Sequence, residues 1–518
     1  MNKINNNEKK IAVILSIINT IVSAVVSIIY IPLLLSTIGK NEYGLYQLIG
    51  SIIAYFSTMY SSINASVMKY YTEYLIKEDY KKMENTLAIS KRIFIFISII
   101  IVIIAIPISY AFKSSFSANL TDNEIKESMF MFKIMILNIL VYLNSSIYSA
   151  SILAHEKFIF RKILDLAVTI LQPISVLCLI KEYPRASTIV IIQLLLNIIS
   201  LFICMYYSKN RLKVKVKYHY KDINLIKGIF SLSSSVLLIS IADQIFWKTD
   251  QIILGSMYGT GIVAEYAIGA QFNSLFISAG VVITSVIVPM ITKINQSENS
   301  SLELSNSFSK IGRYQAYLVL LMLTGVILFG KEFIIIIAGP DFLNAYVVAL
   351  LLMVPYSIDL IQSSGNVILL VKNKNWYKAV ILFTSSIINV GLTYLFAKRF
   401  GMYGAAFATT VSIVTSSWIL MNLVYSRVIK LEIALFWKKI LPIIVFSFIS
   451  LGIGLIIKKI NISNIYIQFI VHGILYVIIY ITIMFYFVMN VDEKSILNEF
   501  IKKLKKHWPL QYCLEISS

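Results

Sequence analysis

Three charged side chains stand close together in the apolar stretch IADQIFWKTDQIILG, residues 241–255: Asp243, Lys248 and Asp250. If this stretch crosses a membrane as a helix, Asp243 and Asp250 lie on one stripe of it and Lys248 lies on the adjacent stripe. A charge at membrane depth costs roughly 3 kcal/mol or more, so such groups usually face a cavity or one another. We expect Asp250 to reach the outer interface, as a cap or in an ion pair with Lys248. Asp243 lies deeper and is a candidate for a cavity wall.

A second carboxylate lies in MVPYSIDLIQSSGNVILL, residues 353–370. Asp359 follows Pro355 by four residues, and Gln362 and Asn366 follow Asp359 at helical spacing. Proline removes a backbone hydrogen bond and kinks a helix. A broken helix beside a carboxylate is how many membrane proteins build a cation site. The alternative is that Asp359 only forms hydrogen bonds with neighbouring serine or asparagine side chains.

Three further positions could bind an anionic or sugar-bearing ligand. Lys69 and Arg92 flank one predicted connection between spans, where they would attract an anionic headgroup, although cations are common at such places. Lys133 lies near the opposite end of a predicted span and can extend to the interface. Asp165 is expected to pair with Arg161 or Lys162. Five tyrosines could stack on sugar rings: Tyr43, Tyr46, Tyr55, Tyr60 and Tyr148.

The composition indicates which elements must position these side chains. Of 518 residues, 58% are hydrophobic and 14% are charged, and the mean hydropathy is +0.79. Soluble domains are near 45–50% apolar and 25% charged. The apolar runs predict an all-α integral membrane protein with about 14 transmembrane helices. Their approximate ranges are 11–35, 43–68, 93–111, 130–153, 160–180, 187–207, 228–249, 262–291, 315–337, 345–370, 377–397, 402–426, 438–457 and 465–489.

The distribution of lysine and arginine predicts the orientation. Most of the 46 basic residues fall in the N-terminus, the even-numbered connections and the C-terminal tail. The positive-inside rule therefore puts both termini in the cytoplasm and accounts for most of the net charge of +20 without a nucleic-acid partner. The basic stretches 209–221 and 495–506 either touch anionic membrane lipids or are simply solvated.

Two internal matches indicate a repeat. LLSTIGKNEYGLYQLIGS (34–51) aligns with LGSMYGTGIVAEYAIGAQ (254–271), and ILAHEKFIFRK (152–162) aligns with LLVKNKNWYKA (369–379). Both fall at the ends of corresponding spans, which predicts two pseudo-symmetric six-helix halves. The expected organisation is a first half at 1–207, a cytoplasmic linker at 208–227, a second half at 228–430, two additional helices at 431–490 and an amphipathic tail at 491–518.

We find no enzyme motif in the structural context that its chemistry requires. GTGIVA (259–264) fits a dinucleotide-binding pattern, but it joins two predicted membrane helices rather than a strand and a helix. The three cysteines imply no disulfide framework. We therefore expect no enzyme activity, no bound cofactor and no metal site, although H+ or Na+ would serve as a coupling ion.

Several stretches resemble one family in order and spacing. KTDQIILGSMYGTGIVAEYAIGAQF (248–272), VIVPMITK from 286, AGPDFLNAYVVALLLM (338–353), FGMYGAAFATTVS (400–412) and NEYGLYQL (41–48) are similar to stretches of polysaccharide flippases. These flippases belong to the multidrug/oligosaccharidyl-lipid/polysaccharide (MOP) superfamily, and the resemblance covers essentially the whole chain.

The resemblance implies a function and its partners. Members of the family move lipid-linked oligosaccharides, such as those on undecaprenyl pyrophosphate, across the bacterial cytoplasmic membrane for surface polysaccharides such as O-antigen. A glycan polymerase and glycosyltransferases would be partners, and transport would use alternating access coupled to a cation gradient. The resemblance leaves two alternatives, a cation-coupled multidrug antiporter of the same superfamily and a lipid II flippase. Such a flippase should have a cationic lumen, whereas the deep charged residues here are mostly acidic.

Overall fold

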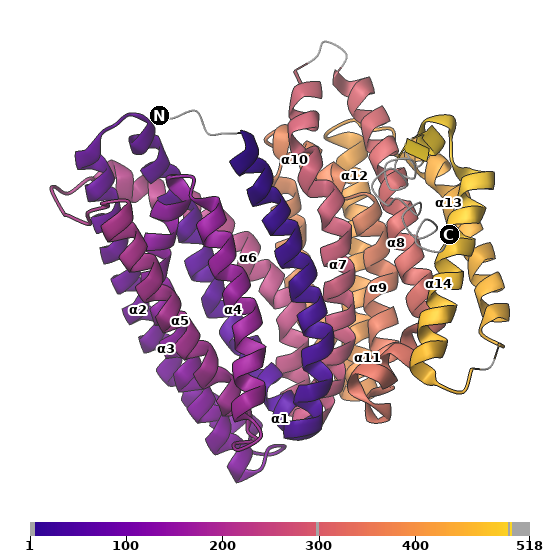
Figure 1. Cartoon of the computed structure of the whole chain (residues 1–518), viewed down its shortest axis with the longest axis horizontal. Helices are drawn as coiled ribbons and strands as arrows, with labels where there is room; N and C mark the ends of the chain where they lie inside the picture. The colour runs from indigo at the N-terminus through magenta and orange to yellow at the C-terminus, as the bar shows by residue number, and fades with distance from the viewer. Residues whose placement is uncertain (1–5, 297–299, 461, 496–497, 500–518) are drawn as a thin grey trace, which may run out of the picture. The chain divides into compact units, whose positions relative to one another are not determined.

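The computed structural model describes residues 6–296, 300–460, 462–495 and 498–499, and its regular elements are helices (Figure 1). This confirms the prediction of an all-helical membrane protein. The elements are α1 (Asn6–Ile76), α2 (Tyr80–Phe116), α3 (Asp122–Ala154), α4 (Phe158–Leu179), α5 (Ala186–Tyr206), η1 (Tyr207–Arg211), α6 (Ile223–Tyr258), α7 (Thr260–Ile294), α8 (Ser300–Ala338), η2 (Pro340–Phe342), α9 (Ala345–Ile361), α10 (Ser364–Val371), α11 (Trp376–Ile413), η3 (Val414–Leu420), α12 (Met421–Arg427), α13 (Ile433–Ile457), α14 (Ile465–Ile483) and η4 (Met484–Val488).

The described helices supply about ten membrane spans. Ten are long and apolar enough to cross a membrane, and the pair α9 and α10, bent by 49°, makes an eleventh if it counts as one span. Two of the continuous helices are kinked at a glycine, α1 at Gly39 and α11 at Gly401. The sequence prediction treats each of these two helices as a pair of spans.

The first sequence match corresponds to a repeated backbone conformation. Gly39 has φ 79° and ψ 175°, and Gly259, its partner in the alignment, has φ 80° and ψ −173°. This region of φ and ψ is essentially closed to residues with a side chain. Each of these two turns therefore requires a glycine at this position.

The second match also repeats in the backbone, and the structure adds a third. Glu156 and Asn373 both have positive φ, 59° and 55°, and in both turns the next N–H donates to the carbonyl five residues back. Lys213 and Lys430 are 217 positions apart, as Glu156 and Asn373 are, and they have φ 54° and 56°. There the next N–H donates to the carbonyl six residues back in both turns. The sequence shows no clear match at this third place, because its residues differ while the turn geometry is the same.

The break predicted around Pro355 lies further along the chain. α9 continues through Pro355 to Ile361, and the bend falls at the two residues before α10. Because Pro355 lacks an N–H, it leaves the Leu351 carbonyl without its helical donor. The Thr410 hydroxyl donates to that carbonyl at 2.5 Å. This substitute bond lets the helix run on past the proline.

The chain divides into two compact units, which differ from a simple split into sequence halves. One unit comprises Met1–Leu275, Ile334–Pro355 and Trp376–Met421, and the other comprises Phe276–Phe333, Tyr356–Asn375 and Asn422–Ser518. In the first unit α1 packs against α3, α4 and α6, and α3 packs against α5. Its core is a continuous cluster of buried apolar side chains that includes Leu45, Phe94, Leu143 and Tyr266.

In the second unit, α8 is joined to the end of the chain by a buried ion pair. Arg313 Nε donates to Glu493 Oε1 at 2.7 Å, and its other nitrogens donate to Glu493 Oε2, the Lys439 carbonyl and the Tyr317 hydroxyl. Burial alone would raise the pKa of the Glu493 carboxyl, but hydrogen bonds from Arg313 and from the Asn490 N–H outweigh it and hold that pKa below its usual value.

Further polar contacts join α8 to the last two spans. Tyr476 donates to the Thr324 hydroxyl at 2.6 Å, and Lys458 forms an ion pair with Glu332 at 2.7 Å. The contacts recur along α8, so α13 and α14 are firmly held within this unit. The predicted amphipathic tail, 491–518, lies mostly outside the described residues.

Candidate functional site

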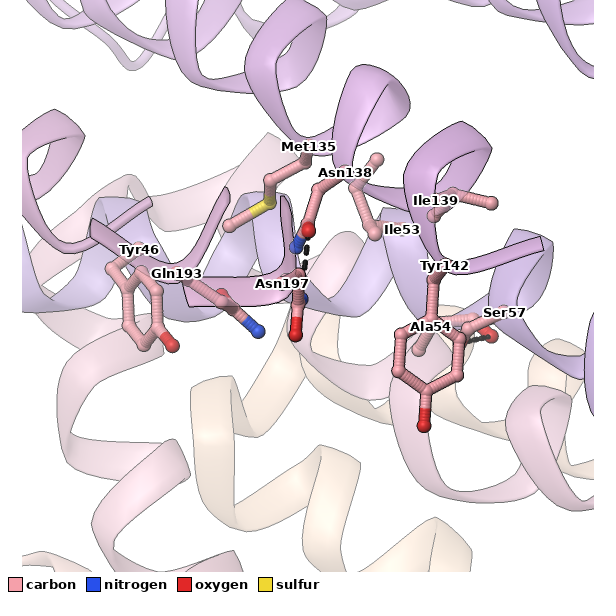
Figure 2. Close-up of a pocket in the computed structure, with 11 residues that line it drawn as sticks. Tyr46, Ile53, Ala54, Ser57, Met135, Asn138, Ile139, Tyr142, Gln193 and Asn197 are labelled. Carbon is pink, nitrogen blue, oxygen red and sulfur yellow. Dashed lines mark hydrogen bonds between the residues drawn. The ribbon is translucent and has the colours of Figure 1, made fainter. Parts of the chain in front are cut away.

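A polar cavity of about 350 Å³ lies within the first unit, among α1, α3 and α5 (Figure 2). Its size falls in the usual range of small-ligand pockets. The residues that line it are Tyr46, Gly50, Ile53, Ala54, Ser57, Met135, Asn138, Ile139, Tyr142, Gln193 and Asn197. None of these lining residues carries a charge.

Helical spacing brings the lining residues onto common faces. On α3, Asn138 and Tyr142 are four residues apart, and on α5, Gln193 and Asn197 are four residues apart. Such pairs lie one above the other on a helix surface. The contacts between α3 and α5 then place the two polar faces side by side.

One hydrogen bond orders the polar side chains of the cavity. Asn197 Nδ2 donates to Asn138 Oδ1 at 2.8 Å, which directs the Asn197 amide oxygen away from Asn138. Figure 2 shows that this oxygen, the Gln193 amide and the hydroxyls of Tyr46 and Tyr142 point toward the same side. Carboxamides and phenols both donate and accept hydrogen bonds. The arrangement therefore suits an uncharged ligand that carries many hydroxyl or amide groups.

A small recess adjoins the cavity and shares Tyr142 and Asn197 with it. Its space, about 20 Å³, is enough for one water molecule. Arg161 lines this recess, together with four serines (Ser145, Ser146, Ser149 and Ser200) and Asn64. Arg161 Nη2 lies 2.8 Å from Asp165 Oδ1, which confirms the predicted pairing and neutralises the cation.

Asp250 is the centre of a second polar cluster, and its placement corrects the expectation from sequence. Its side chain is only 1% exposed, so it is buried in protein rather than at a water interface. Thr393 donates to Oδ1 at 2.9 Å, Thr409 donates to Oδ2 at 2.8 Å, and Tyr266 also donates to Oδ2. These hydroxyls, and not Lys248, are the partners that the structure gives to the carboxylate. They replace the water that a charge at this depth would lose.

The Asp250 cluster has the oxygen ligands that a hard cation requires. Asn389 donates to Thr409 at 3.1 Å, and its own Oδ1 is buried without a hydrogen-bond partner. A carboxylate, hydroxyls and an amide oxygen are typical ligands for such ions. Within the described residues there is no group of three or more His, Cys, Asp and Glu side chains, so a transition-metal site is not supported there.

The other sequence candidates are distributed over both units. Asp243 and Lys248 are half-buried on α6, in the first unit, whereas Asp359 lies on α9 in the second. Lys69 and Lys133 are exposed, on α1 and α3. None of the five lines the cavity in the first unit.

Two of the predicted polar residues near Asp359 lie at the α9–α10 bend. Gln362 is fully buried at the bend itself, and Asn366 accepts a hydrogen bond from the Tyr425 hydroxyl at 3.1 Å. Asp359 lies near enough to Tyr425 to interact with it electrostatically. These four residues share the second unit, and the bend begins three residues after Asp359.

The sequence prediction missed the amide cavity because it followed charges. Of the five tyrosines considered for sugar stacking, Tyr46 lines the cavity. Tyr43 is buried, Tyr55 shares a hydrogen bond with Thr249, and the Tyr60 side chain lies outside the described part of the chain. A signal was present in the spacing of Asn138 with Tyr142, since polar side chains four residues apart inside a membrane span are uncommon.

A third group of polar contacts joins the helices at the end of the first unit where α1 turns at Gly39. Lys40 forms an ion pair with Glu265, which is 4% exposed, and Asn344 donates to the other oxygen of Glu265 at 3.1 Å. Thr260 donates to Glu124 at 2.8 Å. These contacts join the α1 turn and the start of α3 to the first turns of α7. An ion pair and hydrogen bonds therefore stabilise this end in addition to packing.

Comparisons with known proteins agree with this fold. A model of the polysaccharide biosynthesis protein family matches residues 9–295. Among solved structures, lipid II flippase MurJ in an inward closed conformation is 16% identical, with a TM-score of 0.71 over 91% of this chain and 97% of that one. An inward-facing multidrug resistance transporter of the MATE family is 12% identical, with a TM-score of 0.59 over 79% and 94%.

A third solved structure, a MOP superfamily transporter from Pyrococcus furiosus, is 12% identical, with a TM-score of 0.52 over 80% of this chain and 95% of that one. It is described as having a binding pocket of reverse polarity, which suggests a different function for it. No curated protein sequence matches the chain significantly. The fold is shared with solved transporter structures, among them MurJ and the MATE protein. Because the family model covers more than half of the chain, the protein belongs to the polysaccharide biosynthesis protein family and has the fold of the MOP superfamily.

Proposed function

We propose that this protein moves lipid-linked oligosaccharides across the cytoplasmic membrane of a bacterium for the synthesis of a surface polysaccharide. The carrier lipid would be undecaprenyl pyrophosphate. The observation that carries the proposal is the cavity lined by Asn138, Gln193, Asn197 and two tyrosine hydroxyls, without a charged lining residue. Family membership points to a substrate that contains a glycan. The cavity has the hydrogen-bonding groups to hold one.

The cavity also favours a flippase over the multidrug antiporter. A carboxylate in the lining would favour a cationic drug, and the cavity lining has none. A lipid II flippase is the alternative that the MurJ-like fold keeps open, because lipid II also carries sugars. The nature of the accumulated intermediate in a deletion strain separates the two.

Removing the amide groups tests this function. Asn197→Leu keeps the side-chain shape but removes the bond to Asn138 and the free amide oxygen, and Gln193→Leu removes the second amide. We expect the double variant to lower surface polysaccharide about tenfold or more in a complemented deletion strain, with normal protein abundance. Asn123→Leu, at an exposed position of α3, is the matched control.

The deletion strain itself should lack the surface polysaccharide and accumulate lipid-linked repeat units that face the cytoplasm. Accumulated lipid II would instead favour the lipid II flippase. Normal polysaccharide together with raised sensitivity to cationic dyes would show that the antiporter alternative is correct. Normal polysaccharide with the double amide variant would show that this cavity does not bind the glycan.

The orientation and span count belong to the same proposal. We infer fourteen spans, in two six-helix halves and two additional helices, with both termini in the cytoplasm. The repeated turns at Gly39 and Gly259 and at Glu156 and Asn373 support the halves, and the lysine and arginine distribution supports the orientation. Reporter domains fused within 209–221 and after Ser518 should be active only in the cytoplasm. An externally active reporter at either position would disprove the orientation.

Transport would alternate access between the two sides and use a cation gradient. We propose Asp250, with Thr393, Thr409 and Asn389, as the coupling site, because it offers a carboxylate and an unpartnered amide oxygen. Either Na+ or H+ fits a single carboxylate. Asp243, Lys248, Asp359, Gln362 and Asn366 stay proposed pathway residues, as do Lys69 and Lys133 for first contact with the anionic headgroup.

A further inference from the structure

We propose that the cavity in the first unit selects uncharged sugar units, such as hexoses and N-acetylhexosamines, and rejects uronic acids. The inference rests on the proposed function and narrows it to a substrate class. It follows from the charge, the hydrogen-bond polarity and the surroundings of the cavity, each of which is a separate observation.

The charge balance of the cavity is neutral. Its lining residues are amides, hydroxyls and apolar groups. The nearest cation in the adjoining recess, Arg161, is already paired with Asp165 at 2.8 Å. A buried carboxylate without a cation is strongly disfavoured, whereas a neutral hydroxyl needs only a hydrogen-bond partner. A uronic acid in this cavity would therefore lose the solvation of its charge without gaining an ion pair.

The hydrogen-bond donors and acceptors of the cavity also favour a neutral sugar over a uronic acid. Asn197 Nδ2 uses one of its two N–H groups on Asn138 Oδ1, which leaves the Asn197 amide oxygen as an acceptor and the second N–H as a donor. A sugar hydroxyl can donate to that oxygen and accept from the Gln193 amide or from a tyrosine hydroxyl. A carboxylate is an acceptor only, so it can donate no hydrogen bond to the Asn197 oxygen. A sugar hydroxyl therefore satisfies both the donors and the acceptors of the cavity, whereas a carboxylate satisfies only the donors.

Two described cations that were considered for contact with the headgroup lie outside this cavity. Lys69 and Lys133 are exposed and do not line it. The stretch of α1 that follows Ser57, residues 58–63, contains no charged residue in its sequence. A glycan with acidic sugars would call for a cation in the wall of the cavity, but the polar lining residues are Tyr, Ser, Asn and Gln.

Binding of two soluble probes to the purified full-length protein in detergent tests this selectivity. The probes are the methyl glycosides of N-acetylglucosamine and of glucuronic acid, and calorimetry or thermal unfolding at neutral pH measures their affinity. We expect the neutral glycoside to bind about tenfold or more tightly than the glucuronide. Gln193→Lys should raise affinity for the glucuronide and reverse or abolish the preference, because the new ammonium group supplies the missing ion pair. Gln296→Lys, which adds the same charge at an exposed position in the turn after α7, should leave the preference unchanged.

The outcomes separate this inference from the proposed function. Equal affinity for both glycosides, or tighter binding of the glucuronide to the unaltered protein, overturns the selectivity but leaves the sugar site intact. Binding of neither glycoside overturns both the selectivity and the assignment of the cavity to sugar. If Gln193→Lys fails to fold, Ser57→Lys introduces the charge from α1, and the comparison on the unaltered protein still decides the result.

Discussion

Asp250→Ala is expected to abolish glycan transport and to destabilise the protein substantially. The substitution leaves the hydroxyls of Tyr266, Thr393 and Thr409 buried without their acceptor. Each buried donor without a partner costs about 1–3 kcal/mol, so a loss of at least about 3 kcal/mol of unfolding free energy follows. Thermal unfolding in detergent and complementation of surface polysaccharide measure the two effects. Asp341→Ala, which removes an exposed carboxylate, should change neither.

Asp250→Asn separates the structural role of this side chain from coupling. The amide keeps the volume and one acceptor oxygen, so most of the stability should remain. Transport should still fall to background and lose its dependence on the Na+ or H+ gradient, because the charge is gone. Normal, gradient-dependent transport by this variant would refute the coupling site. The same assay on Asp243→Asn and Asp359→Asn determines whether those two carboxylates belong to the pathway.

Gly44→Leu is expected to force apart the helices that meet at the Gly39 end of the first unit. A Cβ atom at Gly44 would lie 1.9 Å from the Thr260 carbonyl oxygen, which is backbone and cannot rotate away. Overpacking of this kind costs about 1–3 kcal/mol, and more when backbone must move. The ion pair of Lys40 with Glu265 lies close by in sequence and would be strained too. We expect a large loss of transport and a lower unfolding temperature.

A glycine elsewhere provides the control for this variant. At Gly391, on α11, a Cβ meets no atom within 4 Å. Gly391→Ala should therefore keep full transport and should slightly stabilise the helix, since alanine favours helix by about 1 kcal/mol over glycine. The double variant Lys40→Met and Glu265→Leu would remove the ion pair without adding a bulky side chain at the Gly44 contact. If Gly44→Leu transports normally, the close approach at this end is not part of the transport cycle.

The sequence was informative where backbone geometry restricts residue choice. Gly39 and Gly259 could be aligned because both turns require a positive φ that only glycine adopts easily. The apolar runs predicted the helices because a membrane leaves few alternatives to helix formation. The turn at Lys213 and Lys430 has the same geometry but tolerates different neighbours, so the sequence shows no clear repeat there.

Residue partners far apart in the chain were much harder to predict. Asp250 was expected at an interface, but its hydroxyl donors Thr393 and Thr409 are 143 and 159 positions away, and no local pattern connects them. The pairing of Arg161 with Asp165 was predicted correctly because it spans a single helical turn. The amide cavity was missed for a related reason, since Asn138 and Asn197 meet only after α3 and α5 pack.

The ion pair between Arg313 and Glu493 has a consequence for the order of biosynthesis. Arg313 lies on a helix of membrane-spanning length, yet its carboxylate partner is translated 180 residues later. At typical elongation rates of 5–20 residues per second, the guanidinium has to wait roughly 10–40 s for that partner. During that interval the newly made α8 must keep Arg313 at the lipid headgroups or against the insertion machinery. We therefore expect the docking of the segment around Glu493 to be the step that fixes α8 in its final place, and nascent chains that stop short of Glu493 to carry an uncompensated charge at Arg313.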